Sequence, residues 1–399
     1  MTDLTYSDLE AACSAGGASV LSSVTELAPA AGPQAGIAPA RYVQGRDGTY
    51  AYETRFIDGE PSSVVVVDSK ASQLNRVEDA ISLAIEEGDA SLSRMPSIRV
   101  DYETLSATDY QLPHRFSDGH IRFGTIDGEV TTKYPAYVAA RNASPANARA
   151  LLELSPVSLA FGAWDSTRKA HQARFRSCLV GEIIGQLADQ TEAGRKPPRR
   201  GSARKDDIAP SVQLNEKDML TLLATQEDEM SPTTVDKITK DAKKAKNKPT
   251  SASVLGLGAI PPSLDGLGFV SCRRIIRSHV LSFSALRQLR FGADNAGNVA
   301  CRALLAALSL HGLALSDQEL ELRANCDLVE AGDPVVTLDG RRGTHTELEP
   351  LVPEVTGPIL ATAIERAVAT AGIRWDGQVL EVTGNPIILA GATADADED

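Results

Sequence analysis

The chain is organised around residues Val64–Glu87, which read VVVVDSKASQLNRVEDAISLAIEE. The four valines at its start are β-branched and predict a strand. Leu74, Val77 and Ile81 then recur at three- and four-residue spacing, which predicts a helix. The polar residues between these elements therefore form a strand-to-helix corner, where the first backbone N–H groups of the helix have no partner within the helix.

This corner is a candidate site for a phosphate or a sugar, because its side chains supply hydrogen-bond donors and two positive charges. The candidate residues are Ser69, Lys70, Ser72, Gln73, Asn75 and Arg76. The run from Ser69 through Val77 contains no acid. The alternative is a capped helix start in which Ser69 or Ser72 accepts a hydrogen bond from the first amides. Both interpretations stay open on the sequence alone.

The composition is that of a globular protein. The chain has 399 residues, of which 42% are hydrophobic and 23% are charged, so it is long for one domain and could form two. Its five cysteines are scattered and never form a Cys-x-x-Cys pair, which argues for a reducing compartment and against a disulfide framework or a zinc site. The N-terminus lacks the pattern of a signal peptide, and no run approaches a membrane span. We expect a cytoplasmic protein.

The charge is unevenly distributed along the chain. The net charge is −13, and from Ala300 to the end there are 6 Lys and Arg against 17 Asp and Glu. By contrast, residues 164–206 carry ten basic and five acidic residues, and five arginines but no acid lie between Asp265 and Asp294. The protein thus combines basic faces with an acidic body, and nucleic-acid binding is not excluded by its net charge.

The sequence predicts a discontinuous core over residues 41–190 and 254–399, preceded by a loose lead-in over residues 1–40 with one short helix. Residues 41–55 predict a hairpin that turns at Asp47-Gly48. Residues 191–253 are polar, with basic runs and one weak helix at residues 216–225. This composition predicts an insertion that is mobile or only locally ordered, and its basic runs are either solvated or an arm that orders on a polyanion.

A second basic segment follows a predicted apolar strand over residues 157–161. Its candidate RNA-binding residues are Trp164, Ser166, Arg168, Lys169, Arg174 and Arg176. An aromatic ring among cations suits base stacking beside phosphate contacts, although a buried tryptophan next to a solvated turn would give the same pattern. Residues 175–187 then predict an amphipathic helix, with Leu179, Ile183 and Leu187 on one face. A long strand predicted at residues 269–283 carries Arg273, Arg274 and Arg277.

The segment Leu112–Arg122 contains His114, Asp118 and His120, which suggests a metal site at first. The spacing fits no metal-binding signature, and no further ligand cluster supports it. A loop that carries Arg115 and Arg122 towards a ligand, or a solvated turn, explains the segment better. We predict neither a metal nor a cofactor.

Four segments taken together resemble a known family. In order along the chain they read DSKASQLNRVE, LPHRFSDGHIR, SPVSLAFGAWDSTRKAHQARFRSCLVGEI and IPPSLDGLGFVSCRRIIRSHVLSFSALRQLRF. They resemble the RAMP-superfamily backbone subunit, of the Cas-seven group, in the type I-G (formerly I-U) CRISPR surveillance complex, Cascade. The resemblance covers about residues 41–182 and 260–291, and it is weaker in the insertion and in the last hundred residues.

The resemblance implies an α+β fold with a ferredoxin-like (RRM-like) RAMP core and inserted finger and thumb elements, the insertion at residues 191–253 being the candidate thumb or inter-subunit arm. It also implies a non-catalytic subunit whose copies stack head to tail along a CRISPR guide RNA and present it to target DNA. The other partners would be the large subunit and the subunit that caps and processes the guide. The corner at residues 69–76 and the basic residues of the later segments would then contact the guide backbone.

Two alternatives come from other functional classes. The first is a metal-independent RNA endonuclease that uses His114, His171 or His279 as its general base, although none of these residues has an orienting partner visible in the sequence. The second is an assembly subunit whose basic faces contact acidic protein partners rather than RNA. RNA content after purification would separate the second alternative from the RNA-binding hypothesis.

Overall fold

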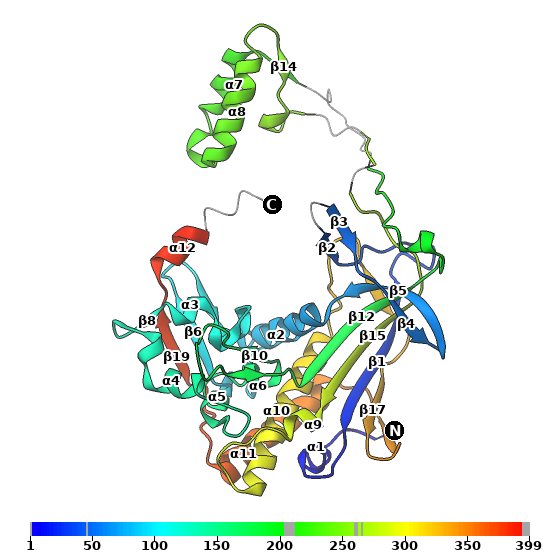
Figure 1. The fold of residues 1–399 in the computed structure, drawn as a ribbon, viewed down its shortest axis with the longest axis vertical. Coiled ribbons are helices and arrows are strands. Elements are labelled where there is room, and N and C mark those ends of the chain that lie inside the picture. Colours follow the sequence, from blue (N-terminus) through cyan, green and yellow to red (C-terminus); the bar gives the residue numbers. More distant parts are fainter. Residues whose placement is uncertain (1, 45–46, 203–211, 259–261, 265, 393–399) are drawn as a thin grey trace. The chain divides into compact units, whose positions relative to one another are not determined.

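The computed structural model describes residues 2–44, 47–202, 212–258, 262–264 and 266–392 (Figure 1). The chain divides into two compact units, one formed by residues 1–196 and 270–388 and the other by residues 197–269 and 389–399. The sequence predicted an insertion over residues 191–253, whereas the continuous part of the second unit extends from Pro197 to Phe269. The acidic C-terminal residues 395–399 lie outside the described residues.

The first unit is built on an eight-stranded sheet with the strand order β18-β17-β1-β15-β12-β5-β4, and β16 also pairs with β1. The strands are β1 (Val20–Pro29), β4 (Tyr52–Ile57), β5 (Glu60–Asp68), β12 (Leu179–Leu187), β15 (Cys272–Ser282), β16 (Leu328–Glu330), β17 (Val335–Asp339) and β18 (His345–Leu348). All the pairings in this sheet are antiparallel.

The connections of this sheet follow a βαββαβ pattern. In chain order they run from β1 through helix α2 (Lys70–Glu86) to β12, then through residues 197–269 of the second unit to β15, and through helix α10 (Asn295–Ser316) to β17. In space the four strands have the order β17-β1-β15-β12, so each helix connects two strands that are separated by a third. This is the ferredoxin-like connectivity, with the hairpin β4–β5 inserted before α2. The α+β class expected from the sequence is confirmed.

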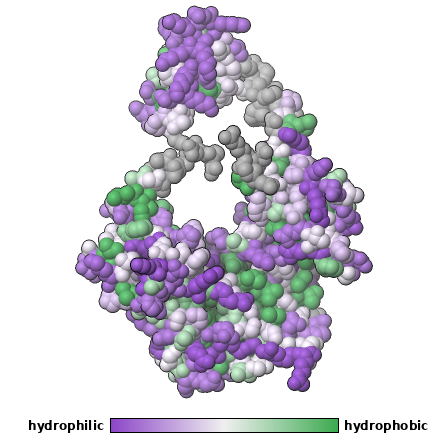
Figure 2. Space-filling model, in the orientation of Figure 1, coloured by the Kyte–Doolittle hydropathy of each residue, from purple (hydrophilic) through white to green (hydrophobic). Residues whose placement is uncertain are grey.

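The two faces of the sheet differ in character. On β12, and on β15 from Arg274 to Leu281, the odd-numbered residues are buried and the even-numbered residues are only partly covered. Helices α2 and α10 pack against the buried face. The open face carries aliphatic side chains such as Ile184 and Ile276, and Figure 2 shows hydrophobic side chains gathered over these strands.

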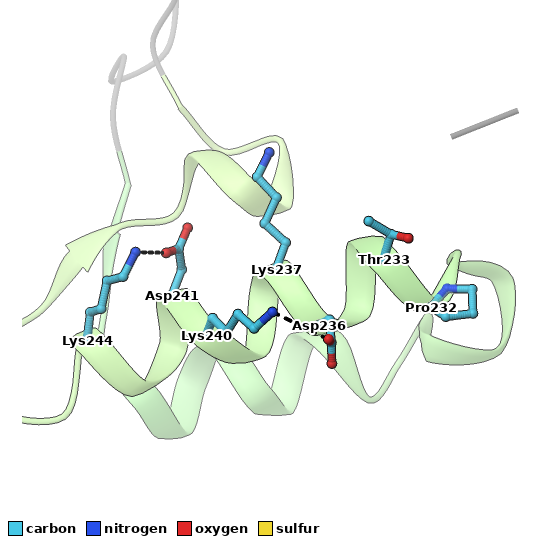
Figure 3. A pocket seen from close by; sticks show the side chains of 7 residues that line it. All are labelled: Pro232, Thr233, Asp236, Lys237, Lys240, Asp241 and Lys244. Carbon is cyan, nitrogen blue, oxygen red and sulfur yellow. Dashed lines mark hydrogen bonds and ion pairs between the residues drawn. The ribbon is translucent and has the colours of Figure 1, made fainter. Parts of the chain in front are cut away.

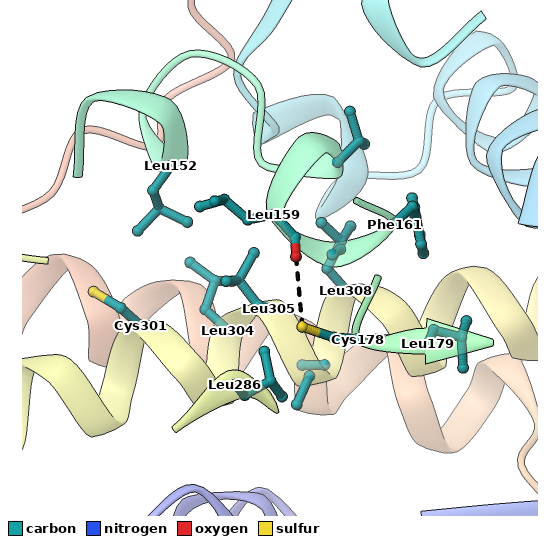
Figure 4. Close-up of a cluster of buried hydrophobic side chains, with 14 of the residues drawn as sticks. Leu152, Leu159, Phe161, Cys178, Leu179, Leu286, Cys301, Leu304, Leu305 and Leu308 are labelled. Atoms are coloured by element: carbon teal, nitrogen blue, oxygen red, sulfur yellow. Dashed lines mark hydrogen bonds between the residues drawn. The ribbon is translucent and has the colours of Figure 1, made fainter. Parts of the chain in front are cut away.

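Helix α10 is the centre of the hydrophobic core. It packs against α2, α1 (Tyr6–Cys13) and α11 (Pro353–Ala371), and its leucines meet Leu159, Leu286 and Cys178 (Figure 4). The helix is long and apolar enough to span a membrane, but 89% of its apolar window is buried inside the protein. The sequence analysis did not identify α10 as a segment with the length and hydropathy of a membrane span. The helix is this apolar because protein covers it on nearly every side.

A smaller sheet and several short helices extend this core. The small sheet has the order β7 (Ser106–Thr108), β6 (Ser97–Asp101), β19 (Val379–Thr383), β8 (Thr125–Ile126) and β9 (Glu129–Val130). The short helices are α3 (Gly119–Arg122), α4 (Pro135–Arg141), α5 (Arg149–Leu152), α6 (Val157–Ala160), α9 (Phe283–Leu286) and α12 (Pro386–Ala392). Two ribbons, β2 (Arg41–Gln44) with β3 (Asp47–Tyr50) and β10 (Ala163–Trp164) with β11 (Arg174–Phe175), complete the strands of this unit.

Two predicted elements have the wrong type. The strand predicted over residues 157–161 is the single-turn helix α6, whose residues are all buried, so its apolar run carries no helical period. The helix predicted over residues 175–187 is the strand β12. Leu179, Ile183 and Leu187 are four residues apart, and this even spacing places them on one face of a strand as well as of a helix.

Two other predictions are correct only in part. The short helix predicted within residues 1–40 is α1, but these residues also contain β1, which lies inside the main sheet between β15 and β17. The buried face of β1 includes Ser23 and Thr25, so apolar alternation is weak in the sequence. The hairpin predicted within residues 41–55 is formed by β2 and β3, but Asp47 and Gly48 belong to strand β3 rather than to the turn, since Gln44 pairs with Asp47. The residues between them, 45 and 46, lie outside the described residues.

The second unit contains a helical hairpin of α7 (Glu216–Leu223) and α8 (Pro232–Lys244), together with the strand pair β13 (Gln213–Leu214) and β14 (Thr250–Ser251). Only a few side chains form its core, among them Met219, Ile238 and Ala242. The outer side of α8 is polar, and Lys240 and Lys244 form ion pairs with neighbouring aspartates along the helix (Figure 3). Most of the lysine-rich run at residues 237–248 thus lies on helix α8, which agrees with a locally ordered insertion.

Gly181 provides a test of the sheet. A Cβ atom at this position would overlap the buried ring of His279 on the neighbouring strand. We expect Gly181→Ala to lower the free energy of unfolding by about 1–3 kcal/mol, because the packed core must shift to accept the methyl group. Gly332→Ala, where the added atom meets open space, is the control and should change stability by less than about 0.5 kcal/mol. Equal denaturation midpoints for the two variants would contradict the packing.

Candidate nucleic-acid interface

The strand-to-helix corner is a capped helix start. Ser69 is the N-cap residue of α2, and its hydroxyl oxygen accepts a hydrogen bond from the backbone N–H of Ser72 at 3.3 Å. This confirms the capping interpretation for Ser69. The hydroxyl group still has further lone-pair capacity, but its position is set by the helix start rather than by a ligand.

The corner is held together by Asp68, whose side chain is fully buried. The Nε2 of Gln73 donates to its Oδ2 at 2.6 Å, the Nε of Arg76 donates to the same oxygen at 3.2 Å, and Arg323 forms an ion pair with Oδ1. Asp68 immediately precedes the acid-free run 69–77, so it was not among the residues predicted for the corner. A buried carboxylate needs such donors, because an unpaired charge in the interior is costly.

The same arginines fasten the chain that follows α10. Arg76 also donates to the backbone carbonyls of Glu321 and Leu322, the latter at 2.9 Å, and Arg323 donates to the carbonyl of Val67 at 2.7 Å. Gln73 and Arg76 are therefore occupied by internal contacts. Lys70 and Asn75 are exposed and have no hydrogen bond or ion pair within the described ranges. The hydroxyl of Ser72 is partly exposed and likewise has no hydrogen bond within the described ranges. Of the six predicted corner residues, Lys70, Ser72 and Asn75 are therefore the ones whose side chains remain open to a ligand.

Arg115 is also used inside the protein. Its Nη2 donates to Oε2 of Glu78 at 2.7 Å, its Nε pairs with Oε1 at 2.5 Å, and its Nη1 donates to the carbonyl of Gly162 at 2.8 Å. Burial raises the pKa of Glu78, whereas the Arg115 guanidinium opposes that rise. Arg115 thus joins α2 to the start of the β10–β11 ribbon. It also lines a groove beside this ribbon.

The three arginines on β15 do not line a common basic surface, which corrects the sequence-based assignment. Arg273 donates to the carbonyls of Leu187 and Ala188. Arg274 lies on the open face of the sheet in ion pairs with Glu26 and Asp58. Arg277 is buried.

Arg277 forms ion pairs with Asp317 at 3.3 Å and Glu330 at 2.6 Å. The separation of these arginines follows from the alternation of side chains along a strand, which sends Arg274 and Arg277 to opposite faces. Burial raises the pKa of Asp317 to about 6, although Arg277 acts in the opposite direction.

The ribbon of β10 and β11 presents the most exposed of the predicted residues. Trp164 pairs across the ribbon with Arg174. Its large apolar side chain is exposed, with 52% of the residue's surface accessible. The guanidinium carbon of Arg174 lies 4.8 Å from the centroid of the Trp164 ring, a cation–π contact. The indole N–H donates to Gln172 at 3.3 Å, which fixes the orientation of the ring.

The loop between these two strands is anchored from below. Arg141 forms an ion pair at 2.7 Å with the buried carboxylate of Asp165, and Arg168 donates to the backbone carbonyl of Arg141 at 2.7 Å. Burial would raise the pKa of Asp165, but hydrogen bonds from Arg141 and Thr167 lower it below its ordinary value. Asp165 therefore stays ionised and serves as an anchor for the loop.

A groove of about 590 Å³ runs beside this ribbon. It brings together five of the predicted residues, namely Arg115, Trp164, Ser166, Arg174 and Arg176, together with His114. Arg174, Arg176 and the exposed Lys169 have no ion pair with a carboxylate in the described part of the chain. Unpaired cations beside an exposed aromatic ring are the combination that binds a single-stranded nucleic acid through its phosphates and bases.

The histidines fall into different environments. His279 is buried between Ser23 and Gly181 on the neighbouring strands. Burial lowers its pKa to about 3, and the positive charge of the nearby Arg277 lowers it further. Such a group has no access to a substrate. His114 and His171 are exposed, and His114 lines the groove.

Asp118 belongs to a local capping structure. Its carboxylate accepts the backbone N–H groups of His114 at 3.2 Å and His120 at 2.9 Å, and His120 Nδ1 lies 2.6 Å from the Tyr102 hydroxyl oxygen. The carboxylate is thus engaged as a cap of α3. Among the described residues no group of three or more His, Cys, Asp and Glu is arranged to hold a metal ion.

Sequence reasoning missed the residues that position this site. Arg323 lies 255 residues from Asp68 and Glu78 lies 37 residues from Arg115, so no local pattern connects either pair. Gln172 is closer, eight residues from Trp164. The hairpin register between Trp164 and Arg174 would have indicated Gln172, had the ribbon been recognised.

Comparison with known families gives one match. Residues 21–190 match the model of the family described as CRISPR-associated protein GSU0053. The matched segment covers less than half of the chain, and it includes β1, the corner of β5 and α2, and the β10–β11 ribbon. It supports a CRISPR-associated protein with a role in CRISPR defence. No curated protein sequence matches the chain.

The Asp68 cluster provides a test of the corner. We expect Asp68→Ala to lower the free energy of unfolding by about 3–5 kcal/mol, because it leaves Arg76 and Arg323 without their buried partner. Lys70→Ala is the matched control at the adjacent exposed cation and should change stability by less than about 0.5 kcal/mol. Urea denaturation of both variants measures the difference. Similar midpoints would show that Asp68 does not hold the corner.

Proposed function

We propose that the protein is a non-catalytic, RNA-binding backbone subunit of a CRISPR surveillance complex, the type I-G Cascade. The observation that carries the proposal is the exposed Trp164 ring, flanked by cations that have no acidic partner among the described residues, on a ribbon within the matched segment 21–190. The ferredoxin-like connectivity of the main sheet is consistent with the RAMP core implied by the resemblance.

The proposed binding mode is independent of base sequence. Arg174 covers one face of the Trp164 ring, and the other face stacks on one base of the guide. Arg176 and Lys169 contact phosphates, and Ser166 and Asn75 offer hydrogen bonds to ribose hydroxyl groups. Every base has a flat aromatic face, so stacking of this kind tolerates any guide sequence.

The proposed assembly follows from the resemblance. Copies stack head to tail along the guide RNA, and the guide pairs with target DNA. The residues 197–269 would provide the thumb or the inter-subunit arm, and the large subunit and the guide-capping and processing subunit would complete a cytoplasmic complex. The family match supports interaction with CRISPR RNA and with other subunits at the level of the family.

The endonuclease alternative is favoured by one observation, the position of His114 in the groove beside Trp164. Against it, the described residues place no carboxylate on the His114 ring to orient it, and its backbone N–H rather than its ring contacts Asp118. We therefore propose RNA binding without cleavage. We expect labelled repeat RNA to remain intact after incubation with the protein, as measured on a denaturing gel.

Fluorescence offers a direct test, because the chain has only two tryptophans and Trp375 is buried with 2% of its surface exposed. Addition of single-stranded guide RNA should quench the emission of Trp164 by stacking. Trp164→Phe, which leaves only Trp375, should abolish the quenching. Trp164→Ala should weaken RNA binding by about 1–3 kcal/mol. Quenching that persists in the Trp164→Phe variant would place the RNA away from the ribbon.

The cations provide a second test. The triple variant Lys169→Ala, Arg174→Ala and Arg176→Ala should weaken binding of every RNA sequence. It should also reduce the slope of log K against log salt by about 1.4, because Arg176 and Lys169 each lose a phosphate contact to a single strand that contributes roughly 0.7. The control removes three exposed cations elsewhere, Lys133, Arg341 and Arg366. If the control changes the slope as much as the triple variant does, binding is diffuse and the assigned surface is wrong.

A further inference from the structure

A groove lies along α2 on the side that does not pack into the core. It is lined by one stripe of the helix, at residues Arg76, Asp79, Ala80, Leu83, Ala84 and Glu87. These positions follow the spacing of three and four residues that brings side chains onto one helix face. The end of α10 and the residues after it form the opposite wall, and the groove has a volume of about 770 Å³.

The floor of this groove suits the approach of another helix. Ala80 and Ala84 are small and four residues apart, so a neighbouring backbone could come close. Leu83 projects from the same stripe with 54% of its surface exposed, and Leu315 of α10 is half-buried beside it. The opposite side of α2, with Val77 and Ile81, is already buried in the core. Asp79, Leu83 and Glu87 are therefore the exposed part of the stripe, whereas Ala84 is buried at its edge.

The rim of the groove is acidic. Asp79, Glu87, Glu319 and Glu321 line it, and none of their carboxylates forms an ion pair with Lys or Arg within the part of the chain that the structure describes. Arg76, the cation of the lining, is held by Asp68 and the backbone carbonyls of residues 321 and 322. Burial raises the pKa of Asp79, against the effect of Arg76. A cation brought to the rim would thus meet unpaired carboxylates.

We propose that this groove is a docking site for a basic amphipathic α-helix of a partner protein. In this mode the apolar ridge of the partner helix covers Leu83 and lies over Ala80 and Ala84, and its flanking lysines or arginines pair with the acidic rim. Nucleic acid is the wrong occupant, because four carboxylates repel phosphates. The lining of this groove shares no residue with the groove beside the β10–β11 ribbon, and the docking proposal does not rest on RNA binding.

The lysine-rich helix α8 of a second copy does not fit this description. Its apolar residues Ile238 and Ala242 are buried in its own unit, and its outer side presents lysines, aspartates and threonine (Figure 3). Such a surface could pair with the acidic rim but would leave Leu83 uncovered. The occupant is therefore expected to supply both apolar and basic groups from one helix.

The test uses a probe peptide and the full chain. The probe is a fluorescein-labelled peptide of about 15 residues, roughly 22 Å of helix, with leucines along one face and lysines on its flanks. A second peptide has the same composition but a scrambled order that spreads the leucines around the helix. Fluorescence anisotropy should show binding of the ordered peptide at least about tenfold tighter than the scrambled one, because only the ordered peptide can cover Leu83. Equal affinities would reduce the groove to a non-specific acidic surface and overturn the proposal.

Charge and apolar variants locate the binding. Glu87→Lys with Glu319→Lys should weaken the ordered peptide by roughly tenfold or more, and Leu83→Ser should weaken it by about fivefold. The control Glu60→Lys with Glu347→Lys makes the same change of charge at exposed acids elsewhere and should have little effect. A control effect as large as that of the groove variant would contradict the assigned site.

RNA binding measured on the same variants keeps the two proposals distinct. Groove variants that lose the peptide should still quench Trp164 with guide RNA. Peptide binding without RNA binding would contradict the proposed function alone, and RNA binding without selective peptide binding would contradict the docking site alone.

Discussion

The buried carboxylate of Asp68 is the constraint on which the rest of this structure depends. It lies at the end of β5, next to the start of α2, and it receives donors from Gln73 and Arg76 of α2 and from Arg323 in the segment that follows α10. A charge in such a position destabilises the fold unless every one of its partners is in place. The arginines that complete it therefore also fix the angle at which α2 leaves the sheet and the path of the chain after α10.

This constraint separates structural arginines from arginines available to a ligand. Arg76, Arg115 and Arg277 look like ligand-binding residues in the sequence, yet each one pairs with an acid that is distant in the chain or just outside the local pattern. Arg174 has no such acid in the part of the chain that the structure describes, and it stacks on Trp164 instead. Counting acids in a local window cannot reveal partners supplied by another element. The ribbon cations were recognisable because their environment is a hairpin, whose contacts are local.

The fold was predictable where one period persists over a long segment, as in β5, α2, β15 and α10. It was not predictable where a pattern fits two periods or none. The four-residue spacing of Leu179, Ile183 and Leu187 is compatible with both a helix and a strand. The segment forms a strand because β12 pairs with β15, which is distant in the sequence. Strand β1 escaped recognition because buried Ser23 and Thr25 interrupt its apolar alternation. Such polar residues are tolerated only because neighbouring strands supply contacts that the sequence does not display.

The distribution of charge explains how an acidic protein could hold a polyanion. With a net charge of −13, the long-range field opposes RNA, but charges in salt solution act over only about 8 Å. Within that distance Arg174, Arg176 and Lys169 dominate the ribbon, whereas unpaired carboxylates dominate the groove along α2. In the proposed function, the acidic surroundings would limit RNA to the places where free cations and an aromatic ring coincide. The same acids leave the helical groove to a basic protein partner, so the two surfaces select opposite ligands without competing for either.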